Sequence, residues 1–182
     1  SAASDVYKRQ EIHMDLRDYI RSIENFPRDG ISFKDITPLL AYPEAFENAV
    51  GHMAKIAATL EPDIVVSIES RGFIFGAPIS LRLGVPFVPI RKEGKLPHTT
   101  NRLSYDLEYG TDVIEIHRDA ITPGQKVVLV DDIIATGGTA EAALNLIESM
   151  GAEVVGVCVL MEITKLRTGQ NLDDKILSVM KY

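Results

Sequence analysis

The sequence predicts an α/β fold with a mostly parallel central sheet flanked by helices. Three observations support this prediction. The 182-residue chain has an ordinary globular composition, with 46% hydrophobic and 25% charged residues. Short apolar runs typical of buried strands recur along it, and segments with apolar residues at helical spacing separate them. Strands that alternate with helices form βαβ units and therefore a parallel sheet.

The first elements alternate in the expected order. Apolar residues at helical spacing from Leu16 to Ile23 predict a helix, which a Pro-to-Gly turn ends. A second helix is expected over Glu44–Leu60. It is followed by a short apolar strand, Ile64–Ile68, and by a helix over Gly72–Leu83. These segments make the first βα unit of the predicted sheet.

The middle of the chain predicts a strand, a loop and a hairpin. Val85–Ile90 is apolar and reads as a strand, whereas Lys92–Arg102 is polar, contains Gly and Pro, and is expected to be a loop. Leu103–Tyr109 and Val113–Ile116 alternate between apolar and polar residues on either side of Gly110–Asp112. This pattern favours a β-hairpin.

The last part of the chain predicts a second βαβ unit. Val127–Val130 is a β-branched and leucine run, as expected of a central parallel strand that is buried on both faces. A helix over Thr139–Met150 and a buried strand over Val154–Met161 follow. Ligands of such sheets bind beyond the carboxyl ends of the strands, so motifs that follow strands are the candidate sites.

The strongest functional motif follows the strand Val127–Val130. Two acids come first, then a loop of two threonines and two glycines, then the start of a helix. Glycines let backbone N–H groups approach an anion, threonines add hydroxyl donors, and a helix N-terminus favours phosphate. Carboxylates beside a bound phosphate suit the hydroxyls of a ribose. The candidate residues are Asp131, Asp132, Ala135, Thr136, Gly137, Gly138 and Thr139.

Other phosphate motifs fit this segment less well. The nucleotide-binding loop G-x-x-x-x-G-K-[ST] is absent, because no lysine follows Gly138. The dinucleotide fingerprint G-x-G-x-x-G is absent as well.

Two further segments place cations directly after predicted strands. The net charge of the chain is −7, so an anionic ligand requires local positive charge. One segment follows Ile64–Ile68 and the other follows Val85–Ile90. The candidate anion-binding residues are Ser70, Arg71, Arg91, Lys92 and Lys95.

The segment from Val127 to Thr139 resembles the signature with which type I phosphoribosyltransferases bind phosphoribosyl pyrophosphate (PRPP). Four other segments are similar to the members of that family that act on adenine, and the similarity runs from Met14 onward in the family's order. These segments are Gly30–Pro38, Glu69–Gly76, Arg91–Pro97 and Leu107–Gly110.

The resemblance implies a type I phosphoribosyltransferase-like fold in a single domain over residues 14–182. It implies a small hood at about 14–40 and a mobile lid hairpin at about 92–112. Residues 1–13 lack an apolar period and precede a Met14 that looks like a native start, so we expect an extension or tag there.

The implied reaction transfers the 5-phosphoribosyl group of PRPP to N9 of adenine, giving AMP and pyrophosphate. Mg²⁺ is implied as cofactor, held mainly by substrate oxygens rather than by a metal site of the protein. A homodimer is implied too. The alternatives are a phosphoribosyltransferase for another purine base and a non-catalytic PRPP-sensing protein.

Roles for individual residues also follow from the resemblance. Asp131 and Asp132 approach the ribose hydroxyls, and the loop Ala135–Thr139 cradles the 5′-phosphate. Arg71 and Lys95 stabilise the leaving pyrophosphate. The residues implied for the lid are Lys95, Glu108 and Tyr109, with Glu108 handling protons on the base, and those implied for adenine are Ser32, Phe33 and Lys34.

Charge and targeting patterns narrow the partners further. A nucleic-acid-binding protein usually presents a basic face, which a chain of net charge −7 does not favour. No secretory signal is visible, and no apolar run approaches the ~20 residues that span a bilayer. We therefore expect a cytoplasmic protein with small-molecule substrates, without nucleic-acid or membrane partners.

Overall fold

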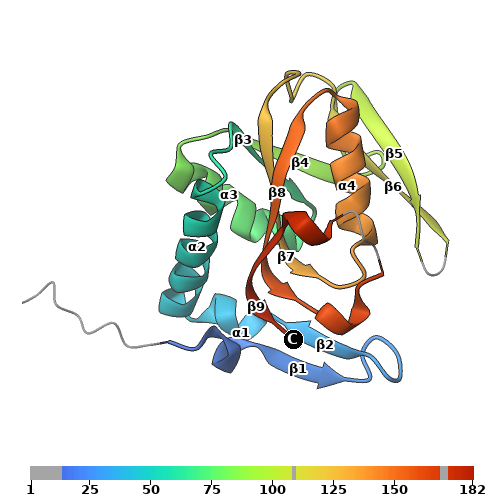
Figure 1. Ribbon diagram of the computed structural model, residues 1–182. Coiled ribbons are helices and arrows are strands. Elements are labelled where there is room, and N and C mark those ends of the chain that lie inside the picture. Colours follow the sequence, from blue (N-terminus) through green and yellow to red (C-terminus); the bar gives the residue numbers. More distant parts are fainter. Residues whose placement is uncertain (1–13, 108–109, 169–171) are drawn as a thin grey trace, which may run out of the picture. The chain divides into compact units, whose positions relative to one another are not determined.

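The computed structural model describes residues 14–107, 110–168 and 172–182 (Figure 1). The chain divides into two compact units, one ending at Ala49 and the other beginning at Val50. The helix α2 (Pro43–Ala58) crosses this boundary in the sequence. Within the described residues, no helix has both the length and the apolar character needed to cross a membrane.

The first unit contains a small antiparallel sheet. A 3-10 helix (Leu16–Tyr19) precedes β1 (Arg21–Glu24), which pairs with β2 (Ser32–Asp35), and α1 (Thr37–Ala41) follows. In the turn between the strands, the Gly30 amide donates to the side chain of Asn25 at 2.8 Å, and Gly30 has a left-handed φ of +83°.

The predicted helix from Leu16 to Ile23 is therefore wrong. The Asp15 side chain accepts a hydrogen bond from the Arg17 amide at 3.0 Å and caps a single helical turn. At Ile20 the backbone is already extended, with φ −105° and ψ 121°. The helical spacing of the apolar residues could not reveal that β2 offers this segment a strand partner.

The second unit is built on a seven-stranded sheet, counted over the described residues, with the order β5-β6-β4-β3-β7-β8-β9. The run from β4 to β9 is parallel, and β5 and β6 form an antiparallel hairpin at one edge. The prediction of a mostly parallel sheet is confirmed. The strands are β3 (Ile64–Ile68), β4 (Phe87–Lys92), β5 (Thr100–Asp106), β6 (Thr111–His117), β7 (Lys126–Ile134), β8 (Glu153–Glu162) and β9 (Ile176–Lys181).

Two crossover helices fix the geometry of the sheet's centre. The helix α3 (Arg71–Leu83) connects β3 to β4, and α4 (Gly138–Ser149) connects β7 to β8 (Figure 1). Because β3 and β7 are neighbours, these connections leave the centre in opposite directions. Right-handed crossovers then place the two helices on opposite faces. The carboxyl ends of β3 and β7 thus form a topological switch point, the usual ligand site of such sheets.

The strands differ from their predicted bounds where pairing with distant residues decides the structure. β7 continues to Ile134 and includes both aspartates, because β8 pairs with it along that stretch. The predicted loop Lys92–Arg102 is shorter than expected, since β5 already begins at Thr100. The sequence did not predict β9 or α1.

Candidate active site

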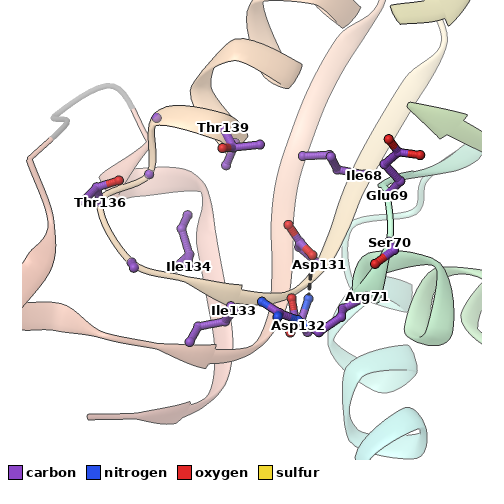
Figure 2. Close-up of a pocket in the computed structure, with 14 residues that line it drawn as sticks. Ile68, Glu69, Ser70, Arg71, Asp131, Asp132, Ile133, Ile134, Thr136 and Thr139 are labelled. Atoms are coloured by element: carbon purple, nitrogen blue, oxygen red, sulfur yellow. Dashed lines mark hydrogen bonds and ion pairs between the residues drawn. The ribbon is translucent and has the colours of Figure 1, made fainter. Parts of the chain in front are cut away.

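A cavity of about 410 Å³ lies at the switch point between β3 and β7 (Figure 2). Three consecutive stretches line it: the end of β3 with the start of α3, the end of β7, and the loop that leads into α4. The lining residues are Ile68, Glu69, Ser70, Arg71 and the continuous run Asp131–Ala140. All seven residues predicted around the phosphate loop are among them, together with Ser70 and Arg71.

The loop before α4 has the backbone geometry of an anion site. Gly137 has a φ of +93°, in the left-handed region that residues with a Cβ rarely adopt. α4 begins at the next residue, so the first amides of the helix lack intrahelical acceptors and are available at the cavity wall. Outside the cavity, the Thr168 amide donates to the Thr136 carbonyl at 3.3 Å and supports the loop.

The two aspartates at the end of β7 have different environments. Asp132 is 3% exposed, and its carboxylate accepts a hydrogen bond from Nε of Arg71 at 2.5 Å. Asp131 is part-exposed and lies between Thr139 and Ser70 (Figure 2). Desolvation, followed by the charge of Asp132, raises the pKa of Asp131 well above its ordinary value of 3.8. A ligand that brings hydroxyl donors or positive charge to Asp131 would relieve this strain.

A glycine lets α3 approach these carboxylates. A Cβ on Gly72 would lie 2.9 Å from Oδ1 of Asp131 and 3.2 Å from the Val130 carbonyl oxygen. The same Oδ1 accepts the amide of Asp132 at 2.8 Å and cannot swing away without losing that bond. Gly72 therefore brings the first turn of α3, with Arg71, against the end of β7.

Glu69 is the site residue to which the sequence assigned no role. Its side chain is 6% exposed and accepts hydrogen bonds from Arg91 Nε at 2.7 Å, from the Lys92 amide at 2.9 Å and from Lys95 Nζ at 2.8 Å. Burial alone would raise the pKa of Glu69, but the hydrogen bonds from Lys95, Lys92 and Arg91 outweigh it and lower the pKa. Arg91 and Lys95 do not line the cavity themselves and are joined to it through Glu69.

Lys92 points toward the hairpin β5-β6 rather than into the cavity. Its ammonium contacts the carboxylate of Asp112, and it lies 3.1 Å from the Tyr105 hydroxyl. That hydroxyl lies 3.4 Å from Oγ1 of Thr139 at the start of α4. Desolvation lowers the pKa of Lys92, but the bonds to Asp112 and Tyr105 outweigh it and raise the pKa. The side chain predicted to bind an anion thus ties the hairpin to the phosphate loop.

The predicted lid residues Glu108 and Tyr109 lie outside the described residues. The peptide bond between Glu69 and Ser70, whose isomer the sequence leaves open, is cis.

The residues predicted to bind the base lie on β2 of the first unit. The Ser32 hydroxyl donates to Glu24 at 2.7 Å, and Lys34 donates to a serine hydroxyl of β1 at 2.7 Å. The half-buried ring of Phe33 packs edge-to-face on Phe26, with ring centroids 5.3 Å apart. These contacts describe the base-binding candidates within their own unit.

The carboxylates of the cavity suit a divalent ion that a substrate brings with it. Among the described residues, no group of three or more His, Cys, Asp or Glu side chains could hold a metal ion. Mg²⁺ is commonly bound through one or two carboxylates together with the phosphates of a substrate. Asp131 and Asp132 are donors of that type at the cavity wall.

Comparisons with known proteins agree with this arrangement. Residues 37–181 match the family model of the phosphoribosyl transferase domain. The adenine phosphoribosyltransferase of Pseudothermotoga lettingae is 48% identical over 93% of this chain and 100% of its own length.

Solved structures show the same fold. The crystal structure of adenine phosphoribosyltransferase from Thermoanaerobacter pseudethanolicus matches with a TM-score of 0.85 and 46% identity, covering 92% of this chain and 98% of that one. The Saccharomyces cerevisiae enzyme, solved with adenine and an imino-altritol bisphosphate, matches with a TM-score of 0.82 and 38% identity over 90% of this chain and 95% of that one. The chain therefore belongs to the phosphoribosyl transferase domain family, and within it to the adenine phosphoribosyltransferases.

Proposed function

We propose that this protein transfers the 5-phosphoribosyl group of PRPP to N9 of adenine, forming AMP and pyrophosphate. One observation carries the proposal. A single cavity at the switch point combines a helix N-terminus, an aspartate pair and Arg71. These are the groups that a phosphate, a ribose diol and a pyrophosphate require, in that order. The S. cerevisiae relative solved with adenine supports the choice of base.

The loop Ala135–Thr139 binds the 5′-phosphate in this proposal. Backbone amides at the start of α4 and the hydroxyls of Thr136 and Thr139 donate to its oxygens. The left-handed Gly137 turns the chain so that these donors converge on the cavity.

Asp131 and Asp132 accept the ribose hydroxyls. Asp131 has the raised pKa and faces the cavity, so hydroxyl donors there stabilise its ionised form. Arg71 is held against Asp132 before substrate binds, and it turns part of its guanidinium toward the pyrophosphate when substrate is present. This contact places a cation beside the bond that breaks.

In the chemical step, N9 of adenine bonds to C1′ while the bond from C1′ to the pyrophosphate oxygen breaks. The electron pair of the broken bond leaves with pyrophosphate, and Arg71, Arg91 and Lys95 stabilise the charge that develops there. The proton of the base must be removed, and we propose Glu108 for this task. Mg²⁺ bound to the substrate oxygens would neutralise part of the charge of the leaving group.

The base lies against Phe33 in this proposal, with the backbones of Ser32 and Lys34 reading its edge. Adenine presents an amino donor and ring-nitrogen acceptors. A 6-oxo purine would mismatch fixed backbone groups and leave polar atoms unpaired, which is a strong basis for discrimination. Tyr109 belongs to the lid that closes over the site and excludes water.

We also propose that the protein acts as a cytoplasmic homodimer. Leu81 on α3 is 83% exposed, an uncommon position for so apolar a side chain. A second copy that covers this helix would bury it.

The test is direct. Purified protein is incubated with PRPP and Mg²⁺ and with adenine, hypoxanthine, guanine or xanthine, and nucleotide formation is followed by chromatography. AMP as the dominant product supports the proposal. A preference for a 6-oxo purine would favour the alternative of another purine base, and PRPP binding without any turnover would favour a sensing protein.

A further inference from the structure

We propose that Glu69 is a positioning residue that holds Arg91 and Lys95 in the orientation in which they bind pyrophosphate. The proposal rests on the function proposed above and assigns a role to a side chain that touches the cations rather than the reacting atoms. Glu69 lines the cavity, whereas Arg91 and Lys95 reach the cavity only through it.

The two oxygen atoms of Glu69 are used differently. Oε2 accepts from Nε of Arg91 at 2.7 Å, and Oε1 accepts both the Lys92 amide at 2.9 Å and the Lys95 ammonium at 2.8 Å. A guanidinium bound through Nε keeps its two outer nitrogen atoms for another anion, and an ammonium keeps two of its three donors. Arg91 is 37% and Lys95 50% exposed, so these outer donors face solvent from which a ligand can bind.

The sheet explains why one carboxylate can reach both cations. β3 and β4 are parallel neighbours with Ile68 opposite Ile90, and the Glu69 amide donates to the Ile90 carbonyl at 3.0 Å. The chain after β4 then turns back at Gly94, whose amide donates to the buried carboxylate of Glu115 at 3.1 Å. This turn brings Lys95 over the end of β3.

Electrostatics distinguishes positioning from simple charge balance. Hydrogen bonds from Lys95, Lys92 and Arg91 keep the buried Glu69 ionised, and its negative charge offsets the repulsion between the two cations. A negative charge close to pyrophosphate would by itself weaken binding of that ligand. Removing Glu69 therefore tightens pyrophosphate binding if charge alone matters, and weakens it if orientation matters.

The experiment measures binding of inorganic pyrophosphate with Mg²⁺ by titration calorimetry to the wild type, Glu69→Gln and Glu69→Asp. Groups that orient a ligand-binding side chain are worth about 10- to 100-fold in comparable sites. We expect Glu69→Gln to lose at least about tenfold in pyrophosphate affinity, and Glu69→Asp to lose less, because it keeps the charge. Affinity for AMP, which contains no pyrophosphate, stays at the wild-type value.

Glu93→Gln is the matched control. Glu93 lies in the same turn, but it pairs with the exposed Arg102 at 3.1 Å and does not contact Arg91 or Lys95. Its removal should leave pyrophosphate affinity unchanged. In steady-state assays the KM for PRPP should rise in Glu69→Gln while the KM for adenine stays constant, a division that general unfolding would not produce.

Unchanged or tighter pyrophosphate binding by Glu69→Gln would overturn the proposal. If that variant does not fold, Glu69→Asp decides, because moving the carboxylate by one methylene must still cost pyrophosphate affinity, and a wild-type value would overturn the proposal. The binding assay needs no adenine. A wild type that binds pyrophosphate but makes no AMP would therefore refute the proposed function and leave the role of Glu69 measurable.

Discussion

The substitution Gly72→Ala tests whether close approach of α3 to β7 sets the geometry of the PRPP site. The new Cβ would lie 2.9 Å from Oδ1 of Asp131, which is 0.5 Å inside the 3.4 Å where ordinary contact begins. The backbone carbonyl of Val130 at 3.2 Å prevents the methyl group from moving the other way. The carboxylate of Asp131 or the start of α3 must therefore shift by a few tenths of an ångström.

The size of the effect follows from this shift. A misplacement of 1 Å can cost about 100-fold in a positioned site, so half of it should cost roughly tenfold. We expect the KM for PRPP in Gly72→Ala to rise by about tenfold. Alanine favours a helix by ~1 kcal/mol over glycine, while overpacking costs about 1–3 kcal/mol. The net loss of stability should thus stay below ~2 kcal/mol, and the protein should remain folded at 25 °C.

The assay combines steady-state kinetics with thermal unfolding, and Gly51→Ala serves as control. Gly51 lies in α2, and its added Cβ would meet only the terminal nitrogen of Arg82 at 3.2 Å, which is the end of a flexible side chain. That variant should keep the wild-type KM for PRPP. Gly72→Ala with wild-type PRPP kinetics would refute the reasoning, since the carboxylate would then tolerate the methyl group.

Three further predictions concern the same cavity. Asp131→Asn should raise Tm at pH 7 and weaken PRPP binding: a raised pKa in the folded state means that stability is lost as pH rises from 3.8 through that pKa, so the gain in Tm should vanish below pH 3.8, and a gain that persists there would contradict the linkage. Gly137→Ala places a Cβ at φ +93°, which should cost about 1–2 kcal/mol in urea unfolding and lower phosphate affinity, and unchanged values would show that the loop relaxes. Lys92→Met removes the cation that contacts Asp112 and Tyr105, so hydrogen exchange in β5 and β6 should accelerate, whereas unaltered protection would remove Lys92 from the support of the hairpin.

The phosphate loop could be predicted from the sequence because its determinants are local. A β-branched run, two acids, two glycines and a helix start follow one another within 13 residues, Val127–Thr139, and the structure brings them to one cavity. Backbone conformation at Gly137 and the dipole of α4 depend on these residues themselves.

Features that depend on distant partners were wrong or missing. The segment from Leu16 to Ile23 has helical spacing, but its strand β1 exists because β2 pairs with it. Asp131 and Asp132 look like the end of a strand in sequence, yet β8 keeps them within β7. Glu69 reads as part of a cationic segment, and its role appears only when β4 lies beside β3, more than 20 residues away along the chain.

A crystal structure with PRPP and Mg²⁺ in the absence of adenine tests the central claim most directly. The account predicts density for the 5′-phosphate against Ala135–Thr139, for the ribose hydroxyls at Asp131 and Asp132, and for pyrophosphate at Arg71. Ligand bound at another surface, with this cavity empty at saturating PRPP, would contradict it.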